Sequence, residues 1–156
     1  MKKIVLFLLT VMMLRMSGCG SGDSATWVET TNTPKQEVVE IRERFFIEQC
    51  LDINYNPENY RGKLVSLEGM YTSWPYHDDT VHVIYRLTQA DDCCPGGGDP
   101  VGFEFRYSGD TVLSDNDWIR VTGNIDIHLE DGNEYVVLNL TELEVMNERG
   151  AEIVHN

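Results

Sequence analysis

Basic residues are scarce in this sequence of 156 residues. It has 12 Lys and Arg side chains against 26 Asp and Glu, and its formal net charge at pH 7 is −14. Nucleic-acid binding requires Lys and Arg to neutralise phosphates, and binding to anionic lipid headgroups requires positive charge as well. The composition therefore argues against nucleic acid as a partner. It favours cations or basic surfaces, while solubility alone is the simpler interpretation.

Long hydrophobic runs are also missing. The apolar stretch Ile4–Leu14 has eleven residues and is interrupted by Thr10. A helix needs about 20 apolar residues to cross a bilayer core, so this stretch is too short for a permanent anchor. Because Lys2 and Lys3 come directly before it, the stretch predicts a secretory signal peptide that is removed from the mature protein.

Motifs for catalysis are absent too. Gly96–Gly98 lie between Pro95 and Pro100 rather than between a strand and a helix, so they predict a flexible loop and not a phosphate cradle. Carboxylates are numerous, but neither their spacing nor an apolar setting singles out one pair as acid and base. We therefore expect the protein not to be an enzyme.

A short motif follows the signal peptide. Met16-Ser17-Gly18-Cys19 resembles the lipobox of bacterial lipoproteins, in which small residues precede a cysteine that becomes the acylated first residue. The resemblance implies cleavage before Cys19 and attachment of acyl chains such as palmitate. These chains would hold the protein on the outer surface or the periplasmic face of the cell membrane. An ordinary secreted protein with a chance cysteine is the alternative.

The mature chain is expected to consist of a tether and one domain. Removal of residues 1–18 leaves nine basic and 26 acidic residues, and therefore a net charge of −17. Residues 19–33 are rich in small and polar side chains and predict a flexible tether. The rest is long enough for one domain and too short for two ordinary ones. We expect this domain to span residues 34–150, with a C-terminal tail at residues 151–156.

The domain is expected to begin with one helix. Thr33 precedes Pro34, and Gln36 follows three residues after the threonine, a combination typical of a helix start with a capping box. Apolar side chains at helical spacing then predict a helix from Pro34 to about Leu51. The β-branched cluster at residues 38–41 leaves a strand open for the first half.

Alternating apolar and polar residues predict strands downstream of the helix. In the third strand, Phe103 and Phe105 face one way, while Glu104 and Arg106 face the other. Gly69 in the first strand predicts a bulge or bend. Five strands that share one core predict a mainly β fold, a small barrel. The predicted strands are residues 63–74, 81–88, 101–107, 117–129 and 135–146.

Two stretches of the chain resemble known barrels. Tyr55–Lys63, followed by Leu67-Glu68-Gly69, is similar to the start of bacterial extracytoplasmic OB-fold domains. Asp117–Gly123 resembles the fourth strand of these domains. The resemblance implies a five-stranded Greek-key barrel of the OB type, which presents one face and the flanking loops to ligands.

A third stretch points to a particular family. The pair Cys93-Cys94 before Val101-Gly102-Phe103 resembles an uncharacterised OB-fold domain at the C terminus of membrane proteins that partner a putative permease. The resemblance covers residues 45–146. It implies a permease or another envelope protein as a partner.

Cys93 and Cys94, flanked by Asp91 and Asp92, are the most distinctive feature of the mature chain. Three interpretations stay open. In the first, the thiolates and nearby carboxylates bind a metal such as zinc. In the second, one of the two cysteines forms a disulfide with Cys50, as the oxidising environment outside the cytoplasm allows. In the third, the pair forms a strained vicinal disulfide or stays as redox-active thiols.

A second polar cluster consists of His77, Asp78, Asp79 and His82. The predicted second strand separates this cluster from Cys93 by roughly 25 Å, at about 3.3 Å per residue, so one joint metal site is not expected. We expect two separate sites or none. In the simpler interpretation, the first three residues form a solvated turn and His82 lies on the surface of a strand.

Aromatic side chains offer a further candidate surface, because OB-folds stack bases or sugars on such residues. Several of them alternate with aliphatic residues along the strands, which favours packing in the core instead. The candidates are Trp74, Tyr76, Tyr85, Tyr107 and Trp118.

Together these features predict a non-enzymatic, lipid-anchored binding module outside the cytoplasm. Its barrel face and its Cys93-Cys94 loop are expected to engage a partner protein or a small ligand. Two alternatives stay open. One is the capture or delivery of a metal of the zinc type at the cell envelope, and the other is a purely structural role there.

Overall fold

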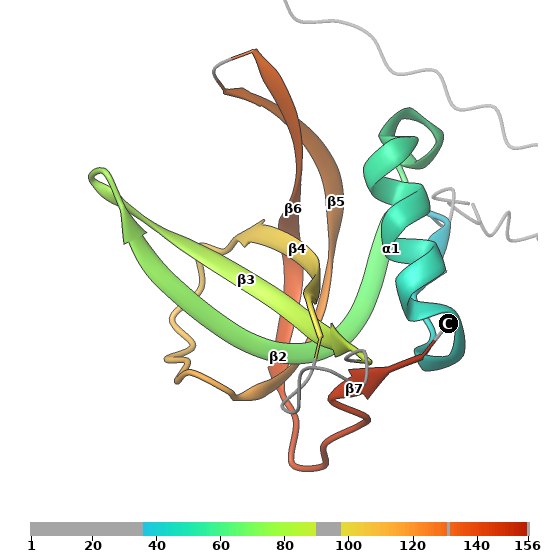
Figure 1. Ribbon diagram of the computed structural model, residues 1–156. Helices are drawn as coiled ribbons and strands as arrows, with labels where there is room; N and C mark the ends of the chain where they lie inside the picture. The colour runs from blue at the N-terminus through green and yellow to red at the C-terminus, as the bar shows by residue number, and fades with distance from the viewer. Residues whose placement is uncertain (1–35, 90–97, 131, 156) are drawn as a thin grey trace, which may run out of the picture. The chain divides into compact units, whose positions relative to one another are not determined.

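The computed structural model describes residues 36–89, 98–130 and 132–155 (Figure 1). The chain divides into two units, residues 1–33 and 34–156, and every described residue belongs to the second unit. In chain order the described elements are β1 (Val38–Glu40), η1 (Glu43–Phe45), α1 (Phe46–Tyr55), η2 (Pro57–Tyr60), β2 (Leu64–Tyr76), β3 (Asp79–Thr88), β4 (Pro100–Arg106), β5 (Trp118–Glu130), β6 (Asn133–Val145) and β7 (Ile153–Val154).

Five of the strands form a closed barrel. β2 pairs antiparallel with β3, β3 pairs antiparallel with β4, and β5 pairs antiparallel with both β2 and β6. β4 and β6 close the ring as a parallel pair, so the order around the barrel is β2-β3-β4-β6-β5. This arrangement confirms the predicted mainly β fold, a five-stranded Greek-key barrel of the OB type.

β2 belongs to both halves of the barrel and bends where it passes from one neighbour to the other. Its residues Leu64–Met70 pair with β5, and Met70–Tyr76 pair with β3. Gly69 lies at this changeover, where a Cβ atom would come within 2.7 Å of the carbonyl oxygen of Tyr85. Glycine permits this close approach of two backbones. The pairing with β5 runs through Gly69 without a register shift, so the strand has no bulge there.

Apolar side chains from the five barrel strands and from α1 fill the barrel. Phe103 and Phe105 are each 3% exposed, while Glu104 and Arg106 between and after them are exposed, as the alternation along β4 predicts. α1 packs against β4 and β6. The buried side chains of α1 are Phe46, Ile47, Cys50 and Ile53.

The helix begins later than the sequence pattern predicts. A helix over residues 34–51 is wrong in its first half, because Val38–Glu40 form β1, which runs parallel to the start of β2. The backbone N–H of Ile41 continues this pairing with a 2.8 Å hydrogen bond to the carbonyl oxygen of Ser66. β-Branched residues suit this extended conformation, so the strand alternative is the correct one. No helix in the described part of the chain has the length and hydrophobicity to cross a membrane.

Gln36 has a different role from the predicted capping box. Its side-chain amide donates to the carbonyl oxygen of Gly62 at 2.8 Å and to Oδ1 of Asn124 at 2.7 Å. The other two residues of the predicted helix start, Thr33 and Pro34, lie outside the described residues. Gln36 therefore connects the chain before β1 to the barrel and does not cap a helix.

The domain extends beyond its predicted end. Residues 151–156, expected as a tail, contain β7, which pairs in parallel with the end of β3. Val154 is 2% exposed and belongs to the core. The carbonyl oxygen of Ala151 accepts a 3.2 Å hydrogen bond from Arg86 of β3. The boundary predicted at residue 150 is therefore too early.

Arg86 is the one buried charged residue among those described, with 3% of its surface exposed. Its guanidinium stacks on the rings of Phe46 and Trp118, 4.9 and 4.8 Å from their centroids, and donates to the carbonyl oxygen of Glu68. An ion pair with Glu43 adds a contact of 3.2 Å. A buried charge needs partners, and those of Arg86 come from η1, α1, β2 and β5. Arg86 therefore connects these elements to β3.

Candidate ligand-binding groove

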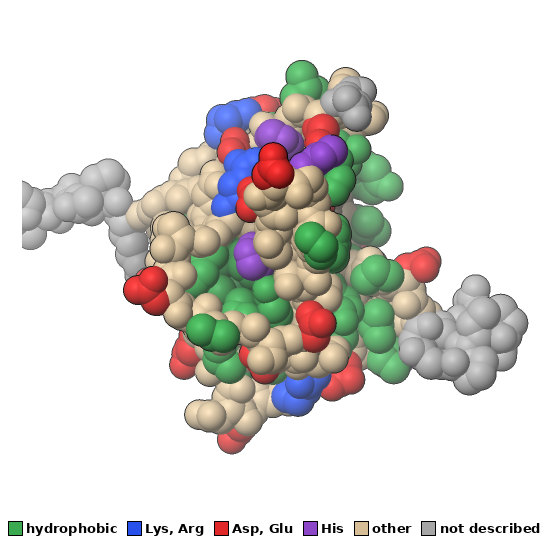
Figure 2. Space-filling model, turned by 90° about the vertical axis from the view of Figure 1, so that its left-hand side faces the viewer, with side chains coloured by type: hydrophobic (Ala, Val, Ile, Leu, Met, Phe, Trp, Pro, Cys, Tyr) green, Lys and Arg blue, Asp and Glu red, His purple; other side chains and the backbone are tan. Residues whose placement is uncertain are grey.

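A groove of about 390 Å³ lies between the β2–β3 and β5–β6 hairpins, and β4 contributes side chains between them. Ligand pockets typically have volumes of about 300–1,000 Å³, so the groove is large enough for a small ligand. Figure 2 shows acidic, basic and histidine side chains around hydrophobic ones on this face of the molecule. The lining residues are Trp74, Tyr76, Asp79, Thr80, Val81, His82, Glu104, Phe105, Arg106, His128, Glu130, Tyr135 and Val137.

Both walls of the groove are hairpin arms. The β2–β3 pairing continues to Tyr76 and the β5–β6 pairing continues to Glu130. Each arm turns at a residue with left-handed backbone, His77 with φ 52° and Gly132 with φ 83°. Figure 1 shows the two arms spreading apart. In OB-folds the connections between strands one and two and between strands four and five flank the ligand-binding face, and these arms correspond to them.

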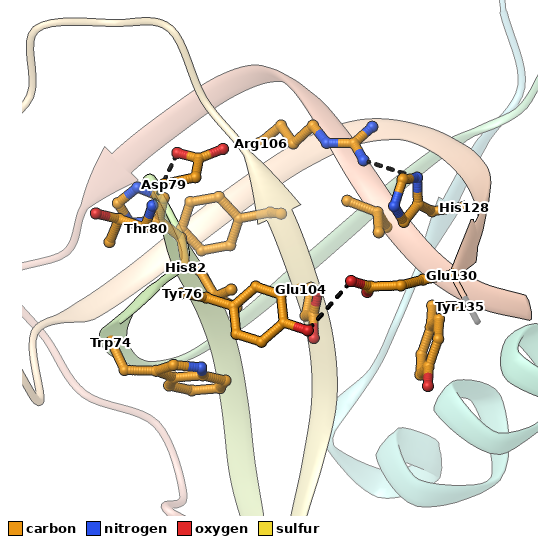
Figure 3. Close-up of a pocket in the computed structure, with 13 residues that line it drawn as sticks. Trp74, Tyr76, Asp79, Thr80, His82, Glu104, Arg106, His128, Glu130 and Tyr135 are labelled. Atoms are coloured by element: carbon orange, nitrogen blue, oxygen red, sulfur yellow. Dashed lines mark hydrogen bonds between the residues drawn. The ribbon is translucent and has the colours of Figure 1, made fainter. Parts of the chain in front are cut away.

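Three aromatic side chains lie half-exposed in the groove (Figure 3). Trp74 and Tyr76 of β2 are 44% and 45% exposed, and Tyr135 of β6 is 44% exposed. Of the other predicted platform residues, Trp118 is only 2% exposed and Tyr107 packs against the core. Trp74 and Tyr76 therefore form an exposed aromatic surface, whereas Trp118 and Tyr107 pack in or against the core.

Polar contacts cross the groove and join its walls. The hydroxyl of Tyr76 on one arm donates to Glu130 on the other arm at 3.1 Å (Figure 3). Arg106 of β4 forms a 3.3 Å ion pair with Asp126 and lies 3.3 Å from Nδ1 of His128. Because a guanidinium only donates, Nδ1 of His128 accepts this bond. The Tyr76–Glu130 hydrogen bond connects the two arms, and the Arg106 contacts connect β4 to β5.

His82 lies in the lining of the groove and is only partly exposed. Its ring stacks on that of Phe105 with 5.5 Å between centroids, and its Nδ1 lies 2.8 Å from the hydroxyl oxygen of Tyr71. The sequence predicts that His82 lies on the surface. In the structure His82 is instead half-buried, and its ring is both stacked and hydrogen-bonded.

The predicted cluster of His77, Asp78, Asp79 and His82 does not converge on a metal site. His77 occupies the β2–β3 turn, with its ring 4.4 Å from that of Tyr76, and Asp79 accepts a hydrogen bond from the next backbone N–H. In the parts of the chain that the structure describes, no three His, Cys, Asp or Glu side chains lie close enough together to hold a metal ion. Asp79 and His82 instead contribute separately to the groove.

The other candidate site residues fall largely outside the described residues. This is true of Cys19, Asp91, Asp92, Cys93 and Cys94. The lipid anchor, the zinc site and the redox-active pair therefore stay predictions.

Cys50 is completely buried on α1 and forms no disulfide with a described residue. Burial raises its pKa to about 12, and the nearby charge of Arg86 opposes this rise only in part. The thiolate is the form that attacks electrophiles and binds metals, so Cys50 is unreactive in this position. A disulfide from Cys50 to Cys93 or Cys94 stays a prediction.

The predicted cysteine loop begins and ends far from the groove. Thr88 and Gly98 close the β3–β4 connection with a 2.8 Å backbone hydrogen bond. His82 lies in the groove, and the six residues from His82 to Thr88 span roughly 20 Å of strand at about 3.3 Å each. The two ends of the loop therefore lie at the opposite end of β3 from the groove.

Reasoning from the sequence did not name several lining residues as site candidates, among them Glu104, Arg106, His128, Glu130 and Tyr135. The first two appear in the sequence only as outward-facing positions of an alternating strand. The other three line the groove because they lie on the β5–β6 arm, which projects beyond the barrel. The OB-fold resemblance was the available signal, since it places the fourth and fifth strands beside the ligand-binding face.

Residues 21–154 match the family described as the DUF1980 C-terminal domain. No curated protein matches the chain. The family match includes the whole barrel and is consistent with the resemblance to an uncharacterised OB-fold domain. Because the motif at residues 16–19 precedes the matched region, the lipobox stays a prediction.

Proposed function

Since the chain belongs to the DUF1980 C-terminal domain family, we propose that its barrel is a binding module that holds a ligand in the groove between the two hairpin arms. The module works outside the cytoplasm, attached to the membrane through acyl chains on Cys19. It has no catalytic step of its own.

One observation carries this proposal: three large aromatic side chains stand half-exposed around one preformed groove. Trp74, Tyr76 and Tyr135 come from two different arms, and each is 44–45% exposed. Exposed apolar surface gathered in one place, with polar groups beside it, is typical of a ligand-binding or protein-binding site. The OB-fold places this surface where such barrels bind their ligands.

The polar groups of the groove support binding rather than catalysis. Arg106 is engaged with Asp126 and His128, and Tyr76 is engaged with Glu130. These contacts hold the strands of the groove in one arrangement. A fixed arrangement favours affinity and specificity, because little order has to be imposed when the ligand binds.

The predicted signal peptide and the lipobox-like motif that ends at Cys19 support the proposed anchor. Acyl chains partition into a bilayer with about 0.8 kcal/mol per buried methylene, and more than one chain gives stable attachment. An acidic domain is repelled by anionic headgroups, so the tether of residues 19–33 would keep the groove accessible above the membrane.

Fluorine NMR tests the groove as a binding site. The full chain, purified from membranes in neutral detergent, is labelled with 5-fluorotryptophan at Trp27, Trp74 and Trp118. Trp→Phe variants assign the three signals. The probes are hexalysine, hexaglutamate and the hexamer of N-acetylglucosamine, which cover positive, negative and neutral envelope polymers.

The proposal predicts that at least one of these probes shifts the Trp74 signal in a saturable way, while the signal of the buried Trp118 stays in place. If none of the three moves the Trp74 signal, the groove is not a binding site for such polymers and the proposal fails.

A further inference from the structure

A second cleft, of about 230 Å³, adjoins the groove. Glu104 and Tyr135 line both hollows, so the two meet at these side chains. The cleft continues between β4 and β6 as far as Asn54 of α1. It exists because β4 and β6 pair only from Glu104 and Val137 onward, which leaves the first residues of both strands unpaired with each other. Together the groove and the cleft, called the joined groove below, extend from the two hairpin arms to Asn54.

The joined groove is strongly acidic. Arg106 is the one guanidinium or ammonium group among its described lining residues, and its ion pair with Asp126 offsets its charge. In Figure 3, Glu104 and Glu130 point into the space between Tyr76 and Tyr135. The carboxylates that line the joined groove are Asp79, Glu104, Glu130 and Glu134.

Two of these carboxylates have no partner within the described residues. Glu104 and Glu134 are exposed, and neither forms a hydrogen bond or ion pair with another described residue. Asp79 and Glu130 each accept one hydrogen bond, from a backbone N–H and from Tyr76. An ionised carboxylate accepts up to about four hydrogen bonds, so the groove holds much unused acceptor capacity and offers few donors.

The aromatic side chains suit the same kind of ligand. An ammonium or guanidinium group over the face of a Trp or Tyr ring is attracted by about 0.5–2 kcal/mol. Trp74, Tyr76 and Tyr135 present half-exposed rings next to the carboxylates. A side chain that ends in an amine thus finds both a ring face and an oxygen acceptor in the groove.

We propose that the joined groove binds an extended, lysine-rich segment of a partner protein, with its amines on the aromatic rings and the unpaired carboxylates. This inference rests on the proposed function and names the ligand class of the same site. Length, charge and ring faces fit such a segment together. A neutral glycan would use the rings and part of the acceptor capacity, but it would gain nothing from the excess of negative charge.

Calorimetric titration of the full chain with N-acetylated, C-amidated hexalysine tests this inference. The matched probe is the same peptide with every lysine side chain acetylated, which keeps the length and removes the charges. The hexamer of N-acetylglucosamine tests the neutral glycan. We expect hexalysine to bind with one-to-one stoichiometry, and both neutral probes to bind at least about tenfold more weakly.

Paired variants separate the groove from the general acidity of the chain. Glu104→Gln with Glu134→Gln removes the two unpaired groove carboxylates. Glu142→Gln with Glu148→Gln removes the same charge at exposed positions outside both hollows. We expect the groove variant to weaken hexalysine binding about tenfold and the control to change it less than about twofold. Thermal melting checks that both variants are folded.

An aromatic pair provides a second, independent measurement. Tyr135→Ala removes a ring of the groove, and Tyr55→Ala removes a ring that is 78% exposed on α1 outside both hollows. Tyr135→Ala is expected to weaken hexalysine binding about threefold to tenfold, and Tyr55→Ala to leave it unchanged.

Each contrary outcome has a distinct meaning. If the glycan binds and hexalysine does not, the groove is a binding site but the ligand class is wrong. If hexalysine binding weakens equally in the groove and control variants, binding is nonspecific and the inference is overturned. If none of the probes binds and the Trp74 fluorine signal is unchanged as well, the inference falls together with the proposed function.

Discussion

Two opposing effects act on the pKa of the buried Cys50 thiol, namely its burial and the charge of Arg86. Arg86 is stacked on Phe46 and Trp118, and its charge lowers the pKa of the nearby thiol. Burial has the larger effect and raises this pKa to about 12. At neutral pH the thiol therefore stays protonated, and its part in the core is that of a small apolar side chain.

The Cys50 thiol should resist alkylation in the folded protein. With iodoacetamide at pH 8, we expect no modification of Cys50 under native conditions and full modification in denaturant with a reductant, because only the unfolded chain exposes the thiol and ionises it readily. Peptide mass spectrometry measures both states. Rapid alkylation of Cys50 in the native protein would contradict the burial.

The same thiol gives the stability of the protein a pH dependence. Its folded pKa, about 12, lies above the ordinary value of 9.0, so the folded state keeps a proton that the unfolded state loses. The contribution of Cys50 is fully present below pH 9 and declines as the pH rises from 9 towards 12. Cys50→Ala should reduce this decline in denaturant melts, and an unchanged alkaline slope would contradict the assignment.

At the scale of the elements, β2 is the strand on which the barrel and the groove both depend. It pairs with β5 before its bend and with β3 after it, and its last residues carry Trp74 and Tyr76 into the groove. The bend requires a residue without a side chain at Gly69, because the backbone of Tyr85 lies too close for a Cβ atom.

Gly69→Ala should therefore destabilise the protein. A methyl group at this position meets backbone atoms that do not rotate away, and overpacking of this kind costs about 1–3 kcal/mol in the free energy of unfolding. Urea melts compare this variant with Glu142→Ala at an exposed position of β6. Equal stability of the two variants would show that β2 does not need a glycine at its bend.

β7 is a short strand, and its contribution to the stability of the fold can be measured at two adjacent residues. Val154 is 2% exposed, and Ile153 is 42% exposed. Val154→Ala opens a cavity in the core and should cost about 1–3 kcal/mol in the free energy of unfolding, more than Ile153→Ala. Urea melts of both variants decide this. The reverse order would mean that residues 151–156 are a tail, as the sequence pattern predicts.

Some elements can be predicted from their own residues, whereas others depend on pairing with a distant strand. The five barrel strands have alternating patterns of their own, such as Phe103 and Phe105 facing inward on β4, and these strands are predicted nearly in full. β1 and β7 have only three and two residues, so each is defined by its pairing with a distant strand. A local pattern contains no information about such a partner.

At the scale of the molecule, the candidate site unites residues from all five barrel strands, four of which form the two hairpin arms. Trp74 and Tyr76 could be named from the sequence as aromatic candidates, whereas Glu130 and Tyr135 become neighbours of them only through the barrel closure. The cysteine pair drew attention in the sequence because it is rare. The described ends of its loop lie at the other end of β3, away from the groove.

The structure also shows where some of the acidic side chains gather. A net charge of −14 is compatible with simple solubility, but four of the carboxylates line one groove that holds three half-exposed aromatic rings. Attraction of a basic partner to such a surface should weaken with salt, because exposed charges are screened over about 8 Å at physiological ionic strength.

Backbone amide NMR of the full chain during titration with acetylated, amidated hexalysine tests the central claim most directly, since it reports where a ligand binds. Our account predicts saturable shifts in residues 74–82, 102–106 and 128–137 and at Asn54, and little change around Thr88 and Gly98. Shifts that gather around Thr88 and Gly98, or spread evenly over the acidic surface, would contradict a binding site in the groove.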